Sequence, residues 1–251
     1  MNRLKDVCRY LDDLLNIHNV PDESRNGLQV EGSANVSRIA FMVNFSREGA
    51  EKAYEEGADM IISHHGLIWG GLKEITGIVH SRLKAIMDRD ISLYTAHLPM
   101  DVHEKFSHGA LLLKALGIDV GGSFGRYGPL QVGVWGELDR TEDVAEMVKR
   151  TEKVLNVPCR TLLFGNSTVK RVGVVSGSGV SALEEAVDEG VDLFITGESK
   201  LAAFDLAKEL GVNVIFGGHY ATETFGLKAM MDTVKKDLGL ETIFIDIPTE
   251  L

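Results

Sequence analysis

The chain is poor in cysteine and in positive charge, and these two shortages exclude several classes of protein. Only Cys8 and Cys159 occur among 251 residues, in no Cys-x-x-Cys pattern, which argues against a disulfide framework and a thiolate metal site. The 37 acidic residues outnumber the 26 basic ones, for a formal net charge of −11. Because no overall basic field is present to hold a phosphate backbone, we do not expect nucleic acid as a partner.

The N-terminus lacks an uninterrupted apolar run. Its first 20 residues instead carry charged side chains between apolar residues at helical spacing, namely Leu4, Val7, Leu11, Leu14 and Leu15. This pattern predicts an amphipathic helix and neither a signal peptide nor a membrane span. The low cysteine content suits a reducing compartment. We therefore expect a cytoplasmic protein without a membrane partner.

The chain contains an internal repeat. Residues 38–66 align without gaps to residues 171–199 at an offset of 133, with identity at seven of 29 positions. Both segments pass through an apolar strand, a polar turn, a helix closed by Glu-Gly and a second apolar strand, which is the pattern of a β-α-β unit. Further along, His97 and Asp101 in one half correspond to His219 and Glu223 in the other, each a His-x-x-x-carboxylate sequence after an apolar run.

The repeat predicts an α/β fold with two duplicated, intertwined halves. We also expect mixed sheets and, from the histidines and the resemblance described below, a dinuclear metal site between the halves. We expect the first half to cover residues 1–128 and the second to cover residues 129–251. No low-complexity linker separates the halves. They are therefore expected to pack as one structural unit, without an inserted domain.

Histidines stand where several predicted strands end. His64 and His65 follow one strand, and His97 and His219 follow two others. Because ligands gather at the carboxyl ends of strands in open α/β folds, these side chains are candidates for metal binding. A single histidine at a strand end is more often an ordinary hydrogen-bonded residue, but the adjacent pair and the two repeated motifs together favour a metal site.

The spacing also bears on how the ions would be shared. Residues four apart on a helix share a face, so His219 and Glu223 can reach one ion or two neighbouring ions if the helix begins at His219. Neighbouring residues of an extended strand point to opposite faces, which favours one ion for His64 and another for His65. Pro99 prefers a first helical turn, which would leave His97 at the strand end.

The donor set has a mixed nitrogen and oxygen character. Such ligands suit zinc, iron, manganese or another divalent transition metal. Three histidines and two carboxylates, shared between two ions, leave coordination positions open for water. Paired ions of this kind commonly catalyse hydrolysis. A second feature, the Ser-Gly-Ser-Gly turn of residues 176–179, is either an anion-binding turn or an ordinary connection between a strand and a helix.

Several segments together resemble the Nif-three-like family, dinuclear-metal proteins often labelled GTP cyclohydrolase I type 2 homologues. The resemblance covers essentially the whole chain and matches the short bacterial and archaeal form. The segments that carry it are NGLQVEG, ISHHG, YTAHLPMDVH, LFITGES, GGHYATE and TIFIDIP.

The resemblance implies a set of site residues. It implies metal ligation by His64, His65, Asp101, His219 and Glu223, with Glu223 as the bridge between two divalent ions. It gives His97 a role in positioning water or transferring a proton, so that His97 and Glu223 are the expected catalytic residues. It also implies a homohexameric ring.

Two functions follow for testing. The first is a metal-dependent hydrolase acting on a small molecule of the nucleotide or phosphoester class, with the ring opening of GTP as the activity that the family label implies. The alternative is a non-enzymatic metal-binding protein with a regulatory, interaction or metal-carrier role. No P-loop or guanine-reading motif is present to choose between them.

Overall fold

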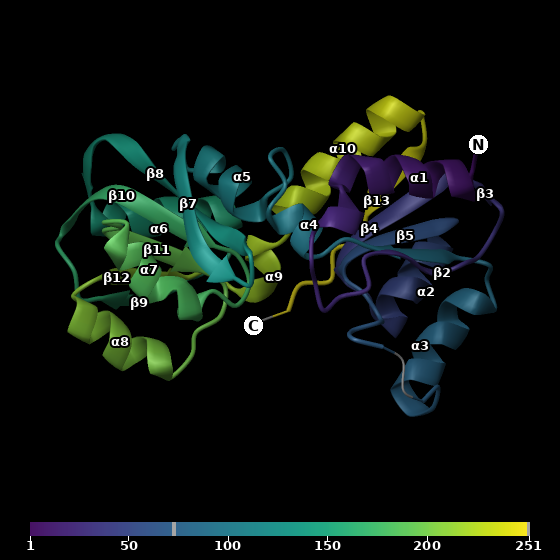
Figure 1. Cartoon of the computed structure of the whole chain (residues 1–251), viewed down its shortest axis with the longest axis horizontal. Coiled ribbons are helices and arrows are strands. Elements are labelled where there is room, and N and C mark those ends of the chain that lie inside the picture. Colours follow the sequence, from purple (N-terminus) through teal and green to yellow (C-terminus); the bar gives the residue numbers. More distant parts are fainter. Residues whose placement is uncertain (72–73, 250–251) are drawn as a thin grey trace. The chain divides into compact units, whose positions relative to one another are not determined.

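The computed structural model describes residues 1–71 and 74–249 of the chain. The chain forms two compact units. Unit 1 contains residues 1–103 and 226–247, and unit 2 contains residues 104–225 and 248–249. Each unit has its own β-sheet with helices on both faces (Figure 1).

Unit 1 is built on a mixed five-stranded sheet in the order β13-β4-β5-β6-β2. The strands are β2 (Gly27–Val30), β4 (Arg38–Asn44), β5 (Met60–His65), β6 (Ser92–Thr95) and β13 (Glu241–Phe244). Four of them run parallel, and β2 is antiparallel to β6. A small antiparallel pair, β1 (Asn2–Arg3) with β3 (Asn35–Val36), adjoins the first helix.

The helices of unit 1 cover both faces of this sheet. They are α1 (Leu4–Leu15), the 3-10 turn η1 (Ile17–Asn19), α2 (Arg47–Glu55), α3 (Gly77–Met87), α4 (Leu98–Asp101) and α10 (Phe225–Leu238). Figure 1 shows α1 and α10 on one face, and α2 and α3 on the other. The predicted amphipathic N-terminal helix is confirmed as α1, whose buried residues are Leu4, Val7, Leu11 and Leu15.

Unit 2 is built on a mixed six-stranded sheet in the order β7-β8-β10-β11-β12-β9. The strands are β7 (Val120–Tyr127), β8 (Leu130–Asp143), β9 (Arg160–Leu163), β10 (Thr168–Val175), β11 (Leu193–Thr196) and β12 (Asn213–Phe216). The central three strands, β10, β11 and β12, are parallel to one another. The outer strands pair antiparallel, so the sheet is mixed as predicted.

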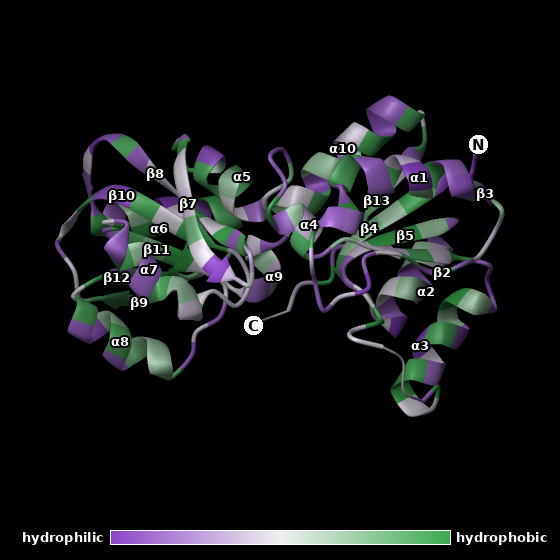
Figure 2. Ribbon diagram, viewed as in Figure 1, coloured by the Kyte–Doolittle hydropathy of each residue, from purple (hydrophilic) through white to green (hydrophobic). Residues whose placement is uncertain are grey.

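The helices of unit 2 also lie on both faces of its sheet. They are α5 (His108–Ala115), α6 (Val144–Leu155), the 3-10 turn η2 (Val180–Ala182), α7 (Leu183–Asp188), α8 (Ala202–Leu210) and α9 (His219–Thr222). Side chains of α5 and α6 share one apolar core with β10, and those of α7 and α8 share another with β12. In Figure 2 the ribbon of α8 alternates between hydrophilic and hydrophobic residues, the pattern of a helix with one buried face.

The two sheets repeat the same register. In unit 1, Ile39 of β4 pairs with Met60 of β5, and in unit 2, Val172 of β10 pairs with Leu193 of β11. Each pairing in unit 2 lies 133 residues after its counterpart, which is the offset of the sequence alignment. The repeat is therefore a structural duplication of a β-α-β unit, as predicted.

A repeated aspartate explains part of the sequence identity. The Asp59 carboxylate accepts hydrogen bonds from the backbone N–H groups of residues 37–38, at 2.6 and 3.1 Å. Asp192 accepts the same pair of bonds from residues 170–171, at 2.8 Å each. In each unit the carboxylate thus ties the start of the second strand to the beginning of the first.

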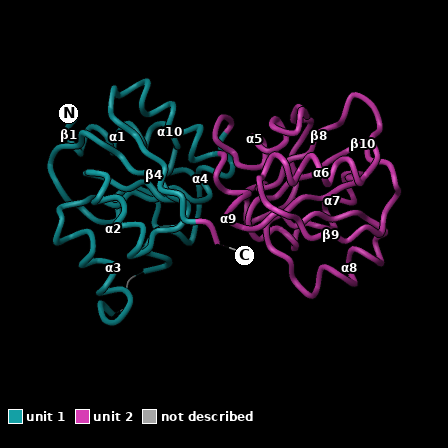
Figure 3. The backbone as a smooth tube through the Cα atoms, turned by 180° about the vertical axis from the view of Figure 1, so that it is seen from behind, with its two compact units in different colours: residues 1–103, 226–247 teal, residues 104–225, 248–251 magenta. Residues whose placement is uncertain are grey.

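The chain crosses between the units just after each His-x-x-x-carboxylate motif. Unit 1 is left at residue 103 and the next helix, α5, packs in unit 2, whereas unit 2 is left after residue 225 and α10 packs in unit 1 (Figure 3). Equivalent helices are therefore exchanged, which confirms the expected intertwined fold. The expected boundary between residues 128 and 129 lies in the turn joining β7 to β8, within unit 2, and stays a prediction about the sequence halves.

Within residues 1–71 and 74–249, the helices lack the combination of length and apolar content that a membrane span requires.

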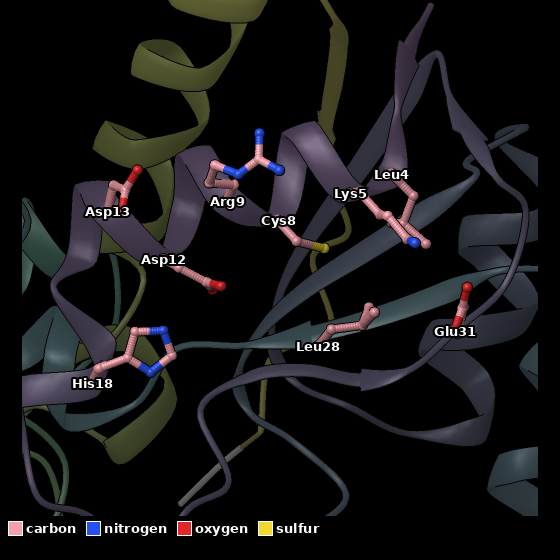
Figure 4. A pocket seen from close by; sticks show the side chains of 9 residues that line it. All are labelled: Leu4, Lys5, Cys8, Arg9, Asp12, Asp13, His18, Leu28 and Glu31. Carbon is pink, nitrogen blue, oxygen red and sulfur yellow. The ribbon is translucent and has the colours of Figure 1, made fainter.

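Cys8 lies on α1 beside a hollow in unit 1 lined by mixed charges (Figure 4). Burial raises the pKa of its thiol to about 11, and the nearby carboxylates of Asp12 and Glu31 add to the effect. Burial likewise raises the pKa of Cys159 to about 11, with a contribution from Glu152.

Both thiols should therefore resist alkylation of the folded protein. Because the thiolate is the nucleophile, only about one thiol in a thousand is reactive at pH 8. The rate at which iodoacetamide alkylates each cysteine should therefore rise about tenfold per pH unit between pH 8 and pH 10. Mass spectrometry of the alkylated protein, compared with protein unfolded in guanidinium, measures this. Equal rates in folded and unfolded protein at pH 8 would contradict it.

Candidate metal centre

The four candidate histidines lie at or just beyond strand ends. His64 and His65 are the last two residues of β5. His97 caps α4, two residues after β6, and Pro99 occupies the first turn of that helix, as predicted. His219 is the first residue of α9, which meets the condition set for its pairing with Glu223.

Three of these histidines gather in unit 1. His64, His65 and His97 each offer a ring nitrogen, and these atoms lie within 4.8 Å of one another. The ring centroids of His64 and His65 are 4.8 Å apart. Consecutive strand residues were expected to point apart, but His65 ends the strand and its ring lies beside that of His64. Both can thus present nitrogen to the same small volume.

Asp101 brings a carboxylate to the same cluster. Its Oδ2 lies 3.6 Å from Nε2 of His64, and the His64 side chain is fully buried. Two ligands of one tetrahedral zinc ion, each about 2 Å from the metal, are separated by about 3.3 Å. The His64 and Asp101 side chains are therefore spaced as ligands of a single ion would be.

In unit 2 the second motif forms a closer pair. Nε2 of His219 lies 3.1 Å from Oε1 of Glu223, whose side chain is only 6% exposed. Gly177 packs directly against both, because a β-carbon at this position would overlap Oε1 of Glu223 and lie 2.9 Å from Nε2 of His219. Its backbone has φ of +61°, which also favours glycine.

Every candidate histidine is held through Nδ1. The partners are the Ala96 carbonyl for His64 at 2.9 Å, the Asn44 side-chain oxygen for His65 at 2.7 Å, Asp22 for His97 at 3.0 Å, and Glu198 for His219 at 2.6 Å. These acceptors favour the tautomer with the proton on Nδ1, which directs the Nε2 lone pair toward a ligand. An imidazole held this way by its other nitrogen is typical of metal ligands.

The sequence did not identify these outer partners. Asp22 also accepts hydrogen bonds from the side chain of Asn26 and the backbone N–H of Leu98, at 2.9 and 3.0 Å. Asn26 belongs to the NGLQVEG segment and in turn accepts from the backbone N–H of His97, at 2.8 Å. A signal for Glu198 did exist, because it occupies the repeat position of His65.

Two of the four outer partners, Asp22 and Glu198, are carboxylates. Burial alone would raise the pKa of Asp22, but its hydrogen bond from His97 and the other donors outweigh burial and lower the pKa. The same balance, with His219 as the main donor, lowers the pKa of Glu198. Burial lowers the pKa of His219, but Glu223 and Glu198 together overcome it and raise the pKa from 6.5 to about 9.

The Ser-Gly-Ser-Gly turn has a structural role beside this pair. The backbone N–H groups of Gly177 and Gly179 donate to the hydroxyls of Thr222 and Thr196, at 3.1 and 2.9 Å. Two of the groups that an anion would need are thus already engaged. The turn instead brings Gly177 against His219 and Glu223, which supports the ordinary reading of the turn over the anion-binding one.

The donor chemistry fits a divalent transition metal. Unit 1 provides imidazole nitrogens and the Asp101 carboxylate, and unit 2 provides His219 with Glu223. Mixed imidazole and carboxylate ligands suit zinc, iron or manganese. The described residues can therefore hold metal, and the buried side chains of His64 and Glu223 have the chemistry of ligands.

A family model described as Duf34/NIF3 (NGG1p interacting factor 3) matches residues 2–250. The chain belongs to the Duf34/NIF3 family. Two relatives named GTP cyclohydrolase 1 type 2 homolog come from Archaeoglobus fulgidus and Pyrococcus abyssi, with 44% and 43% identity. The alignment to the first covers 99% of both chains, and that to the second covers 98% of this chain and 99% of the relative.

Solved structures of similar proteins show the same fold. A protein titled ybgI, of unknown function, matches with a TM-score of 0.93 and 33% identity. TTHA1606 from Thermus thermophilus matches with a TM-score of 0.89 and 36% identity. Each match covers 99% of this chain and 100% of the other. The resemblance drawn from the sequence motifs is therefore confirmed, together with the α/β fold class.

Proposed function

We propose that this Duf34/NIF3 protein is a dinuclear metal-dependent hydrolase. It would hold two divalent ions of zinc, iron or manganese. The proposed ligands are His64, His65, Asp101, His219 and Glu223. The observation that carries the proposal is the shared arrangement of the histidines, each held through Nδ1, with a carboxylate facing Nε2 of His64 and of His219.

The path of the chain supports the use of ligands from both units. Asp101 stands two residues before unit 1 is left at residue 103, and Glu223 stands two residues before unit 2 is left at residue 225. Each motif is thus tied covalently to a crossing. We propose that Glu223 bridges the two ions.

When bound, two neighbouring divalent ions supply Lewis acid activation of water and of the group under attack. The protein must then manage protons. His97 donates its Nδ1 hydrogen to the buried Asp22 carboxylate, at 3.0 Å, which leaves Nε2 as the basic nitrogen. We propose that His97 accepts and returns a proton through Nε2, while Asp22 fixes the orientation of the ring.

The proposed substrate is a nucleotide or another small phosphoester. The support is the name GTP cyclohydrolase 1 type 2 homolog carried by relatives that align over nearly their whole length. We further propose that the protein acts in the cytoplasm as a homohexameric ring, as the family resemblance implies.

Metal analysis and a substrate screen test the proposal together. Purified protein should contain about two divalent ions per chain, or should take them up after chelation and reconstitution. Manganese, iron and zinc forms would be screened against nucleotides and phosphoesters, with Glu223→Gln as the inactive variant and the exposed Glu184→Gln as its charge-matched control. Protein that takes up no metal on reconstitution would sink the proposal.

A second function is a metal-dependent interaction protein or metal carrier. The family description, NGG1p interacting factor 3, names an interaction and not a reaction. This alternative predicts two readily exchanged ions and no turnover in any metal form. A metal-dependent partner, lost in His65→Ala, would favour it over the hydrolase.

A further inference from the structure

The outer partners of the proposed ligands differ in charge. We infer that the two metal positions have unequal affinity, and that Glu198 makes the position served by His219 the tighter one. The inference rests on the proposed function, since it concerns the same ions. It assigns Glu198 as a positioning residue that acts on the metal through His219.

The contrast lies in the group that accepts the Nδ1 hydrogen bond of each imidazole. His64 has the neutral carbonyl of Ala96 behind it, and His65 has the neutral side-chain amide of Asn44. His219 alone among the three proposed histidine ligands has a carboxylate, with Oε1 of Glu198 at 2.6 Å from Nδ1. The three ligands are thus of one type, but the Nδ1 hydrogen bonds of His64 and His65 go to neutral acceptors and that of His219 goes to a carboxylate.

This difference strengthens one ligand. A carboxylate that accepts the Nδ1 hydrogen makes the imidazole a better electron donor, and such partners commonly change metal affinity by about 10- to 100-fold. The side chains of His219 and Glu198 are 25% and 35% exposed, and their contact is 2.6 Å long, so water screens this charge only in part. The same charge attracts a proton to His219, but a divalent ion carries twice the charge and gains more from it.

Lys200 reduces this effect without removing it. Its ammonium lies 3.7 Å from Oε2 of Glu198 and donates to the hydroxyl of Ser178. The Lys200 side chain is half exposed, so its charge is better screened than that of the shorter Glu198–His219 contact. The negative charge behind the ring therefore persists.

Asp22 does not give unit 1 the same advantage. Its carboxylate backs His97, which is outside the proposed ligand set, and it is shared among further donors on Ser24, Asn26 and Leu98. Its charge thus acts on the proposed proton acceptor, and the ligands His64 and His65 keep their neutral partners.

Titration of the metal-free full chain with zinc alone, against a chromophoric chelator at pH 8, tests this inference. Wild type should bind two zinc ions in two steps whose dissociation constants differ by about tenfold or more. Glu198→Gln, which keeps an acceptor for Nδ1 without the charge, should weaken the tighter step by about tenfold or more while the total remains two ions. Glu184→Gln, an exposed change of the same charge in unit 2, should leave both steps unchanged.

The reverse substitution provides a second test if Glu198→Gln folds poorly by circular dichroism. Asn44→Asp places a carboxylate behind His65 and should tighten one of the two steps by about tenfold. Equal steps in wild type, or variants that leave both steps unchanged, would overturn this inference while two ions still bind. A wild-type protein that binds no zinc, manganese or iron would instead overturn the proposed function.

Discussion

A Gly177→Ala variant is expected to lose the metal ion served by His219 and Glu223, with affinity reduced by about 100-fold or more, or about 3 kcal/mol. The added methyl group would overlap Oε1 of Glu223 and come within 2.9 Å of Nε2 of His219. Both atoms are proposed ligand atoms, and Glu223 is buried, so neither can move aside without leaving its position. Zinc titration and metal content after gel filtration measure the effect.

The matched control is Gly128→Ala in the turn between β7 and β8. Gly128 has φ of +59°, close to the +61° of Gly177, but apart from its chain neighbours no described residue has an atom within 4 Å of the place that a β-carbon would take. Both variants therefore carry a backbone penalty of about 1 kcal/mol, and only Gly177→Ala adds the overlap. Equal metal affinity in the two variants would show that the close approach of Gly177 does not shape the site.

An Asp192→Ala variant is expected to lower the free energy of unfolding by about 2 to 4 kcal/mol. The carboxylate accepts two backbone hydrogen bonds of 2.8 Å from residues 170–171, and its removal leaves both N–H groups without this partner. Guanidinium unfolding followed by circular dichroism measures the loss.

The duplication supplies the comparison for this prediction. Asp59→Ala removes the equivalent pair of bonds in unit 1 and should cost a similar amount. Asp188→Ala, an exposed position at the end of α7, should change stability by less than about 0.5 kcal/mol. A loss at Asp192 no larger than that at Asp188 would mean that the repeated aspartate is dispensable.

Much of the fold could be predicted because the duplication compares the sequence with itself. Residues 38–66 and 171–199 predicted the two β-α-β units, and the sheet register confirmed their offset. The pairing of His219 with Glu223 required a helix that begins at His219, and α9 begins there. These features depend on local pattern, such as apolar alternation and glycine at helix ends.

The exchange of helices was harder to predict in detail. The segments that form α5 and α10 have similar apolar spacing, and that spacing does not indicate which of the two sheets each helix packs against. The choice depends on the length and direction of the connections after Asp101 and Glu223. The sequence could indicate intertwined halves, but it could not place the crossings.

The outer partners of the histidines were missed for a related reason. Asp22 is 75 residues from His97, and Asn44 is 21 residues from His65. Such hydrogen bonds depend on which strands are neighbours and have no local spacing rule. Only the repeat alignment, which sets Glu198 at the position of His65, contained a hint of one of them.

The exchange of helices also has a consequence for synthesis on the ribosome. Residues 104–225 of unit 2 emerge as one continuous stretch, whereas the sheet of unit 1 lacks β13 and its α1 face lacks α10 until residues 226–247 have followed. The usual order, in which the N-terminal part of a growing chain folds first, is therefore reversed. The nascent N-terminal segment must wait, with an incomplete sheet, for the last strand of the protein to be made.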